Sequence, residues 1–189
     1  YVKGEVGVGG NLVPAPPRVV GVAGYAGEIG HLPINPQGSG CGCGSYGCWE
    51  TEIGERAMLE HAGRAATGGR EAVASLVAAA AAGEPAALEG LAHVGSWLGI
   101  GLAGLINTLN PSLVVLGGNF QRIHPFVAAQ LERVLERRAL PASRELVSIV
   151  PGALGVDGPL IGAAEYALEP LLADPAAHLA RVRAGRPAR

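Results

Sequence analysis

The chain has 189 residues, of which 49% are hydrophobic and 16% are charged, and this suits one globular domain or one lobe of a larger protein. Its net charge of −2 gives no indication of the strongly basic surface that is typical of nucleic-acid-binding domains. The longest apolar stretch covers residues 97–106, which is shorter than the roughly 18 residues of a membrane-spanning helix. We therefore expect a folded domain without a membrane segment or a signal peptide.

The first part of the chain is predicted to be extended. Residues 1–8 have the pattern of a strand that runs into glycines, and a short second strand is expected near Leu12 and Val13. A loop follows through Pro14, Pro16 and Pro17.

Helical patterns dominate the middle of the chain. Apolar residues at helical spacing predict helices over residues 50–64 and 71–82. The strongest pattern covers residues 88–109, where leucines recur at three- and four-residue steps. Its glycines are expected to let a neighbouring element approach closely: Gly95, Gly99, Gly101 and Gly104.

Strands and helices alternate in the last part of the chain. Residues 113–116 read as a buried strand that ends in a glycine pair, and residues 146–150 as another strand. Amphipathic patterns predict helices over residues 126–140 and 159–172. The alternation predicts an α/β domain.

All three cysteines fall in one eight-residue window, as Cys41, Cys43 and Cys48, and His31 lies just upstream. Three thiolates and one imidazole are a complete ligand set for tetrahedral Zn²⁺. An odd number of cysteines leaves one thiol without a disulfide partner, so free or redox-active thiols are the alternative. Because four protein ligands would close the coordination shell, we expect a structural zinc ion rather than a catalytic one.

The residues around the cysteines form a longer pattern. It reads Glu28-x-Gly30-His31, nine residues, then Cys41-x-Cys43-Gly44-x-x-Gly47-Cys48-x-Glu50. This pattern resembles the zinc-loop signature of the ROK family of repressors, open reading frames and kinases. The resemblance implies that Glu28, His31 and Glu50 contact sugar hydroxyls, and that His31 also binds zinc. Without it, Glu28 is a solvated residue and Glu50 a charge that is favoured at a helix N-terminus.

The resemblance also implies a fold and a domain arrangement. The fold would be the C-terminal lobe of a ribonuclease-H-like, actin-like ATPase, covering residues 1–172 with an inserted zinc loop at residues 28–50. Residues 173–189 are expected to form an exposed basic tail.

Two features of a family kinase are absent from this sequence. No D-x-G-G-T phosphate loop occurs, and the aspartates are Asp157 and Asp174, both late in the chain. Phosphoryl transfer needs a positioned base and a phosphate-binding site, so the chain is expected to be inactive as an enzyme.

The stretch from Gly4 to Gly10 bears on the choice between repressor and kinase. It matches the position of a second phosphate loop in family kinases, but Val6 stands in place of the expected threonine and Glu5 would repel a triphosphate. A strand-turn-strand hairpin is the alternative explanation of its glycines.

We interpret the chain as the sugar-sensing lobe of a ROK-type transcriptional repressor in the cytoplasm. A sugar or sugar derivative would be the inducer, the protein would be a homodimer, and DNA would be bound only through an N-terminal domain absent from this chain. An ATP-dependent sugar kinase is the main alternative, and a zinc-stabilised scaffold without a ligand is a third.

Overall fold

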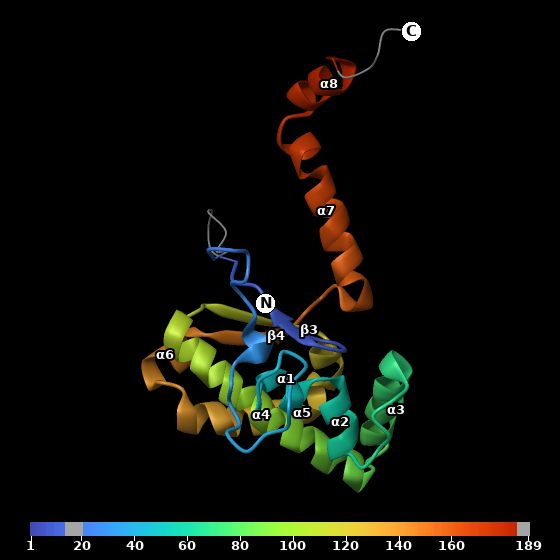
Figure 1. The fold of residues 1–189 in the computed structure, drawn as a ribbon, viewed down its shortest axis with the longest axis vertical. Coiled ribbons are helices and arrows are strands. Elements are labelled where there is room, and N and C mark those ends of the chain that lie inside the picture. Colours follow the sequence, from blue (N-terminus) through green and yellow to red (C-terminus); the bar gives the residue numbers. More distant parts are fainter. Residues whose placement is uncertain (14–20, 185–189) are drawn as a thin grey trace. The chain divides into compact units, whose positions relative to one another are not determined.

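The computed structural model of the protein describes residues 1–13 and 21–184. The chain divides into two compact units, Tyr1–Gly152 and Ala153–Arg189. Figure 1 shows the elements of both units in the colours of the sequence. The loop predicted at Pro14, Pro16 and Pro17 lies outside the described residues, as do the last five residues of the predicted tail.

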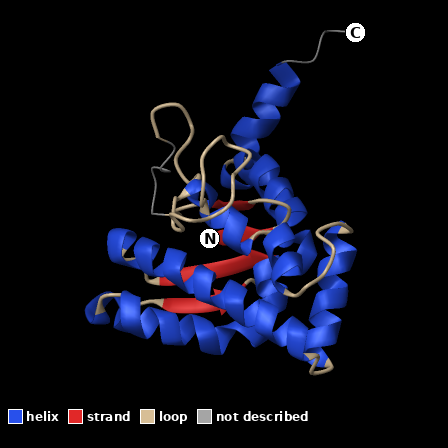
Figure 2. Cartoon of the chain, turned by 60° about the horizontal axis from the view of Figure 1, so that its bottom comes forward, coloured by secondary structure: helices blue, strands red, loops and turns tan. Residues whose placement is uncertain are grey.

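The first unit contains a mixed four-stranded sheet (Figure 2). Its strands are β1 (Val2–Gly4), β2 (Val8–Gly10), β3 (Leu113–Gly118) and β4 (Ser148–Pro151). The order across the sheet is β2-β1-β3-β4, with β1 and β2 antiparallel and the other neighbours parallel. The α/β class expected from the sequence is therefore confirmed.

The predicted strand over residues 1–8 is a hairpin instead. Strands β1 and β2 pair in the register Val2 to Gly10, and the backbone N–H of Glu5 donates to the carbonyl of Gly7 at 2.8 Å in the turn between them. The hairpin interpretation is thus the correct one. The second strand expected near Leu12 and Val13 was wrong, because these two residues follow β2 without pairing to the sheet.

The helix predicted over residues 50–64 is two helices, α1 (Trp49–Ile53) and α2 (Glu55–His61). Gly54 separates them in an extended conformation, with φ −66° and ψ 171°. The next residue then donates its backbone N–H to the carbonyl of Glu5 at 3.2 Å, which ties the start of α2 to the hairpin turn.

The central helix is α4 (Pro85–Leu109), preceded by α3 (Gly69–Ala81). Helix α4 ends at Asn110, whose left-handed conformation caps it. Three of the four predicted glycines do lie against neighbours, and at Gly101 a Cβ atom would overlap the Trp49 ring. Gly104 has no neighbour there within 4 Å, so the expectation for it was wrong.

Helix α4 is long and apolar enough, by length and composition alone, to cross a membrane. The apolar stretch is therefore longer than the predicted residues 97–106, because alanine and glycine extend its apolar character. However, 56% of the apolar window is buried within the protein. Its residues with 0% exposure, which belong to the core, are Ala87, Leu91, Val94, Leu98, Leu102 and Ile106. The helix is thus apolar because it lies in the core of the unit.

Helix α5 (Asn119–Arg138) follows β3 directly and contacts α4 as well as β1, β3 and β4. It begins seven residues before the predicted start, and Pro125 lies inside it. Proline lacks an N–H and usually interrupts a helix, so the sequence pattern placed the start too late. A short helix, α6 (Pro141–Leu146), was not predicted.

The second unit contains α7 (Gly158–Ala173) and α8 (Pro175–Ala184). Helix α7 agrees with its prediction to within one residue at each end, and α8 lies in the predicted tail. None of the residues of α7 is buried, and Leu160 and Leu172 are 73% and 71% exposed.

Two histidines face each other between α2 and α4. The ring centroids of His61 and His93 are 4.1 Å apart, and Nε2 of His61 is buried without a hydrogen-bond partner among the described residues. Burial lowers the pKa of His61 and His93 lowers it further, whereas Glu52 and Glu60 oppose the shift. His61 therefore resists protonation in the folded protein.

This histidine predicts a loss of stability in acid. The unfolded chain binds the proton near the ordinary histidine pKa of about 6.5, so the free energy of unfolding should fall as the pH drops below about 6.5. Urea unfolding at pH 7.5 and 5.5 should show a smaller pH dependence for His61→Gln than for the parent. His178→Gln, in α8, is the control and should keep the dependence of the parent. Equal pH dependence in all three proteins would contradict the assignment.

Candidate metal centre and ligand-binding carboxylates

The structure brings the four predicted metal ligands together. His31 ends the 3₁₀ turn η1 (Ile29–His31), Cys41 and Cys43 lie in the following loop, and Cys48 is the N-cap of α1. Sγ of Cys41 is 3.6 Å from Nδ1 of His31, and Sγ of Cys43 is 3.7 Å from Sγ of Cys48. All four ligand atoms lie within 4.8 Å of one another.

These distances fit a tetrahedral zinc ion. Zn–S bonds of about 2.3 Å and Zn–N bonds of about 2.0 Å give edges of about 3.8 Å between sulfurs and about 3.5 Å between sulfur and nitrogen. The two short separations are close to these values, and three sulfurs with one imidazole are a common structural zinc set. The residues present therefore fit the ion that the sequence predicts.

Backbone hydrogen bonds shape the loop independently of any ion. The N–H of Cys41 donates to the carbonyl of Ser45 at 2.7 Å, and the N–H of Gly44 donates back to the carbonyl of Cys41 at 3.0 Å. Gly47 has φ of 63° and lies so close to the carbonyl oxygen of Asn35 that no Cβ atom fits there. A glycine is required at this position, immediately before Cys48.

The thiols differ in their surroundings. Cys48 is fully buried, and burial is the main cause that raises its pKa to about 12, with Cys43 and Cys41 adding to the shift. Cys43 is exposed, and the backbone hydrogen bond from Ser45 is the largest cause that lowers its pKa. A bound dication removes the penalty for the buried thiolate, because metal binding releases the thiol proton.

The predicted sugar-binding carboxylates lie beside the metal ligands along the chain. Glu28 is exposed at the N-cap of η1, and its carbonyl accepts the N–H of His31 at 3.1 Å. Glu50 is half-buried in the first turn of α1, and its Oε2 accepts the N–H of Val8 at 2.9 Å. Because η1 contacts both α1 and β2, these elements form one neighbourhood.

Glu52 is a further residue that the sequence analysis did not identify. It is 7% exposed, and its Oε1 accepts a hydrogen bond from Nδ2 of Asn35 at 2.8 Å. The pattern of charges gave no signal for it, because a glutamate in a short acidic helix is typical of a solvated position.

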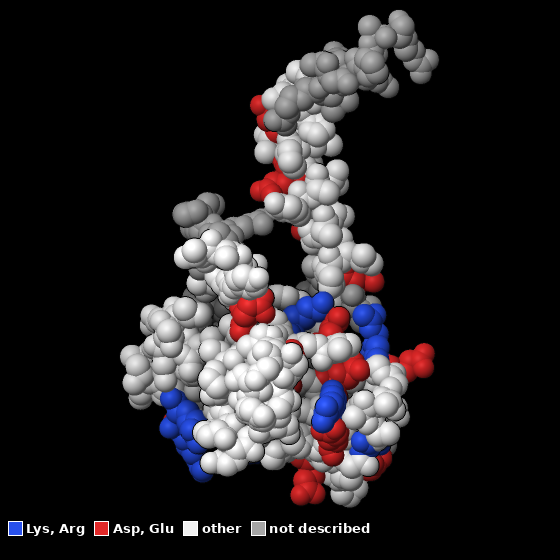
Figure 3. Space-filling view, viewed as in Figure 1, with Lys and Arg blue, Asp and Glu red and all other residues white. Residues whose placement is uncertain are grey.

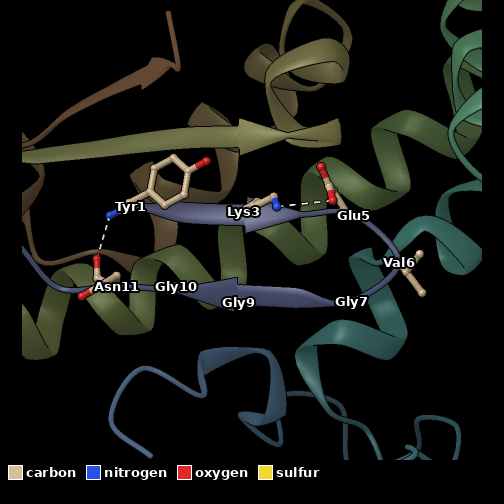
Figure 4. Close-up of a pocket in the computed structure, with 8 residues that line it drawn as sticks. All are labelled: Tyr1, Lys3, Glu5, Val6, Gly7, Gly9, Gly10 and Asn11. Atoms are coloured by element: carbon tan, nitrogen blue, oxygen red, sulfur yellow. Dashed lines mark hydrogen bonds and ion pairs between the residues drawn. The ribbon is translucent and has the colours of Figure 1, made fainter. Parts of the chain in front are cut away.

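A shallow hollow lies over the hairpin (Figure 4). Its lining includes Lys3, Glu5 and Val6, and the Lys3 ammonium pairs with the Glu5 carboxylate at 3.3 Å. Arg70 approaches the other Glu5 oxygen at 3.7 Å. Val6 is 82% exposed in the turn, where it presents no hydroxyl group.

Comparison with known proteins gives a consistent picture. The ROK family model matches residues 1–169. The xylose repressor of Bacillus spizizenii is 28% identical over 172 residues, which are 91% of this chain and 44% of the repressor. A glucokinase of Streptomyces coelicolor is 30% identical over an alignment of 181 positions, which covers 87% of this chain and 57% of the kinase. The chain thus spans about half the length of these relatives.

Solved structures include relatives of both kinds. A ROK family glucokinase from Streptomyces griseus, in complex with glucose and AMPPNP, has a TM-score of 0.76 at 26% identity, over 87% of this chain and 58% of that one. A ROK family transcriptional regulator, a homologue of the E. coli MLC protein, has a TM-score of 0.67 at 26% identity, over 79% and 40%. The actin-like ATPase fold expected from the sequence is confirmed by these neighbours.

We predict that the protein binds one zinc ion per chain through His31, Cys41, Cys43 and Cys48. Elemental analysis of protein purified without added metal measures the content. Absence of zinc from a folded preparation whose thiols all react freely would contradict the site.

We also predict that Cys43→Ser greatly weakens zinc binding and destabilises the loop. A hydroxyl is a poor zinc ligand, and the free energy of metal binding is coupled to folding. Cys43 is exposed, so the change removes little packing. Ser45→Ala, in the same exposed loop, keeps the backbone hydrogen bond and is the matched control. Zinc content and thermal unfolding of the two variants should differ clearly.

Proposed function

The chain belongs to the ROK family, and on this premise we propose that it is the sugar-sensing lobe of a ROK-type transcriptional repressor. The observation that carries the choice of repressor over kinase is the turn between β1 and β2. The relatives themselves are of both kinds, since they include xylose repressors, the regulator NagC of E. coli and glucokinases. Sugars are named in the descriptions of several, and this supports a sugar as the ligand.

The hairpin turn is poorly suited to a nucleotide phosphate. Val6 has no hydroxyl to offer, and the Glu5 carboxylate lies at the hollow where a triphosphate would be repelled. Lys3 and Arg70 both pair with Glu5, so the carboxylate and the two cations partly offset one another's charge. These contacts support a lobe that does not bind ATP.

The sugar would be held by Glu28, His31 and Glu50. A carboxylate can accept several hydrogen bonds, so Glu50 can receive sugar hydroxyls while its Oε2 accepts the N–H of Val8. His31 would bind zinc through one ring nitrogen and leave the other for the ligand. Zinc would thereby fix the orientation of a sugar-binding side chain.

The remaining parts of the proposal concern the larger protein. Residues 1–172 would be the lobe and residues 173–189 a tail, with the exposed leucines of α7 suited to cover by other parts of the protein. DNA would be bound by an N-terminal domain, in a cytoplasmic homodimer. In agreement, the face shown in Figure 3 is largely uncharged and carries basic and acidic side chains in small groups. Sugar binding would shift the population between conformations that differ in DNA affinity.

A ROK sugar kinase is the second candidate. It is favoured by the glucokinase relatives, of which that of Streptomyces coelicolor is 30% identical, and by the TM-score of 0.76 to the Streptomyces griseus glucokinase. In that case the turn at Val6 would approach the nucleotide through its backbone alone.

We predict that the chain neither hydrolyses ATP nor phosphorylates glucose, N-acetylglucosamine or N-acetylmannosamine. The reason is the lack of a positioned base and of a hydroxyl in the hairpin turn. A coupled assay of the purified protein measures the turnover. Turnover above background that co-purifies with the chain would favour the kinase.

We predict that Glu28→Ala and Glu50→Ala weaken sugar binding in the full-length protein without changing its zinc content. Charge-assisted hydrogen bonds of about 1.5 to 3 kcal/mol each give a loss of roughly ten- to hundredfold in affinity. His31→Ala should lose zinc and sugar together. Calorimetric titration with xylose and with glucose, beside metal analysis, separates these effects.

Glu89→Ala is the control for this series, because Glu89 is exposed on α4. It should bind like the parent. If the Glu28 and Glu50 variants also keep the affinity of the parent, the two carboxylates have no role in ligand binding and the scaffold interpretation becomes the better one.

A further inference from the structure

The carboxylate of Glu52 is buried, although the sugar-binding proposal gives it no role. Glu52 is 7% exposed, and its Oε1 accepts a hydrogen bond of 2.8 Å from Nδ2 of Asn35. A buried carboxylate is unfavourable unless it is hydrogen-bonded, so this contact is a strong constraint on both residues.

Asn35 links the two sides of the metal loop. It lies four residues after His31, and its backbone N–H donates to the carbonyl of Gly47, next to Cys48, at 3.1 Å. Its own carbonyl accepts the N–H of Gly38 at 2.9 Å, and its side-chain Oδ1 accepts the N–H of Gln37 at 3.2 Å. Asn35 therefore holds the segment that follows His31 against the segment that precedes Cys48.

Glu52 lies on a rigid support. Helix α1 begins at its N-cap Cys48, a candidate metal ligand, and Glu52 follows one turn later. Trp49, three residues before Glu52, and Ile53, directly after it, are fully buried. The indole Nε1 of Trp49 donates to the carbonyl of Trp97 at 2.9 Å. The core thus fixes helix α1. Because Glu52 belongs to this helix, its hydrogen bond with Asn35 also holds the loop in place.

We propose that Glu52 is a positioning residue of the metal centre, which acts through Asn35 to hold the His31 side of the loop in register with Cys48. The inference rests on the proposed zinc site. A tetrahedral ion tolerates only small errors in ligand position, so a loop that is held in place before binding retains the metal longer. Loss of the contact should speed metal release while the ligands themselves remain.

The test compares zinc release to an excess of chelator in the parent, Glu52→Ala, Asn35→Ala and the double variant. Each single variant should release zinc about tenfold faster, by analogy with residues that orient metal ligands. The double variant should be no faster than the faster single variant, because both changes break the same contact. Glu52→Gln should release zinc at nearly the rate of the parent, since its side-chain oxygen can still accept from Asn35.

The visible absorption of the cobalt-substituted proteins gives a readout of ligand geometry that a general loss of stability would not move. The spectrum of Glu52→Ala should broaden or shift, and that of Glu52→Gln should match the parent. Glu89→Ala, which removes an exposed glutamate away from the loop, is the control for loss of a carboxylate elsewhere in the protein. A parent that binds neither zinc nor cobalt would overturn the metal site itself.

Two results would overturn the positioning role in a parent that does bind zinc. One is a parent-like release rate and cobalt spectrum in both Glu52→Ala and Asn35→Ala. The other is a Glu52→Gln variant that is as fast as Glu52→Ala, which would assign the effect to the charge rather than to the hydrogen bond.

Discussion

The buried start of α1 is the constraint on which the rest of the candidate site depends. Trp49 is completely buried against Gly101 of α4, and its indole is hydrogen-bonded to the carbonyl of Trp97. This anchoring holds the residue on either side of it: Cys48, one of the four candidate metal ligands, and Glu50, which accepts the backbone N–H of Val8 in β2. The buried Trp49 thus lies between a candidate metal ligand and the carboxylate that contacts the hairpin.

The burial of Cys48 next to Trp49 also makes a negative charge on its sulfur unfavourable. A thiol that is enclosed by the core resists ionisation, and the pKa of Cys48 is raised accordingly. The nearby sulfurs of Cys41 and Cys43 would make a second and third thiolate still less favourable without a cation. Both the shape of the loop and the charge of its thiols therefore favour a bound cation. The backbone turns bring the candidate ligands together, and three ionised sulfurs at this distance are stable only beside a positive ion.

Features that depend on short sequence spacing could be predicted, and those that depend on tertiary contacts could not. The four candidate metal ligands lie within eighteen residues and are tied by local turns, so their pattern was sufficient to predict that they lie close together. The break at Gly54 arises because the following N–H bonds to the hairpin, and the burial of Glu52 arises because Asn35 returns to it from the loop. Neither partner, Glu5 in the hairpin or Asn35 in the loop, can be identified from the local sequence pattern. The early start of α5 was hidden by Pro125, which is tolerated because the helix is packed between α4 and the sheet.

Repressors and kinases share this lobe, so the difference in their functions depends on a few positions. The proposed zinc loop is compatible with either, because in both cases it would orient His31. The hairpin turn favours the repressor, since phosphate binding needs donors and the turn here offers an apolar side chain beside a carboxylate. If the proposed residues hold a sugar while the turn is unsuited to phosphate, the lobe would bind its ligand without a reaction to follow. A change in conformation on sugar binding would then be its output, and this is what a repressor requires.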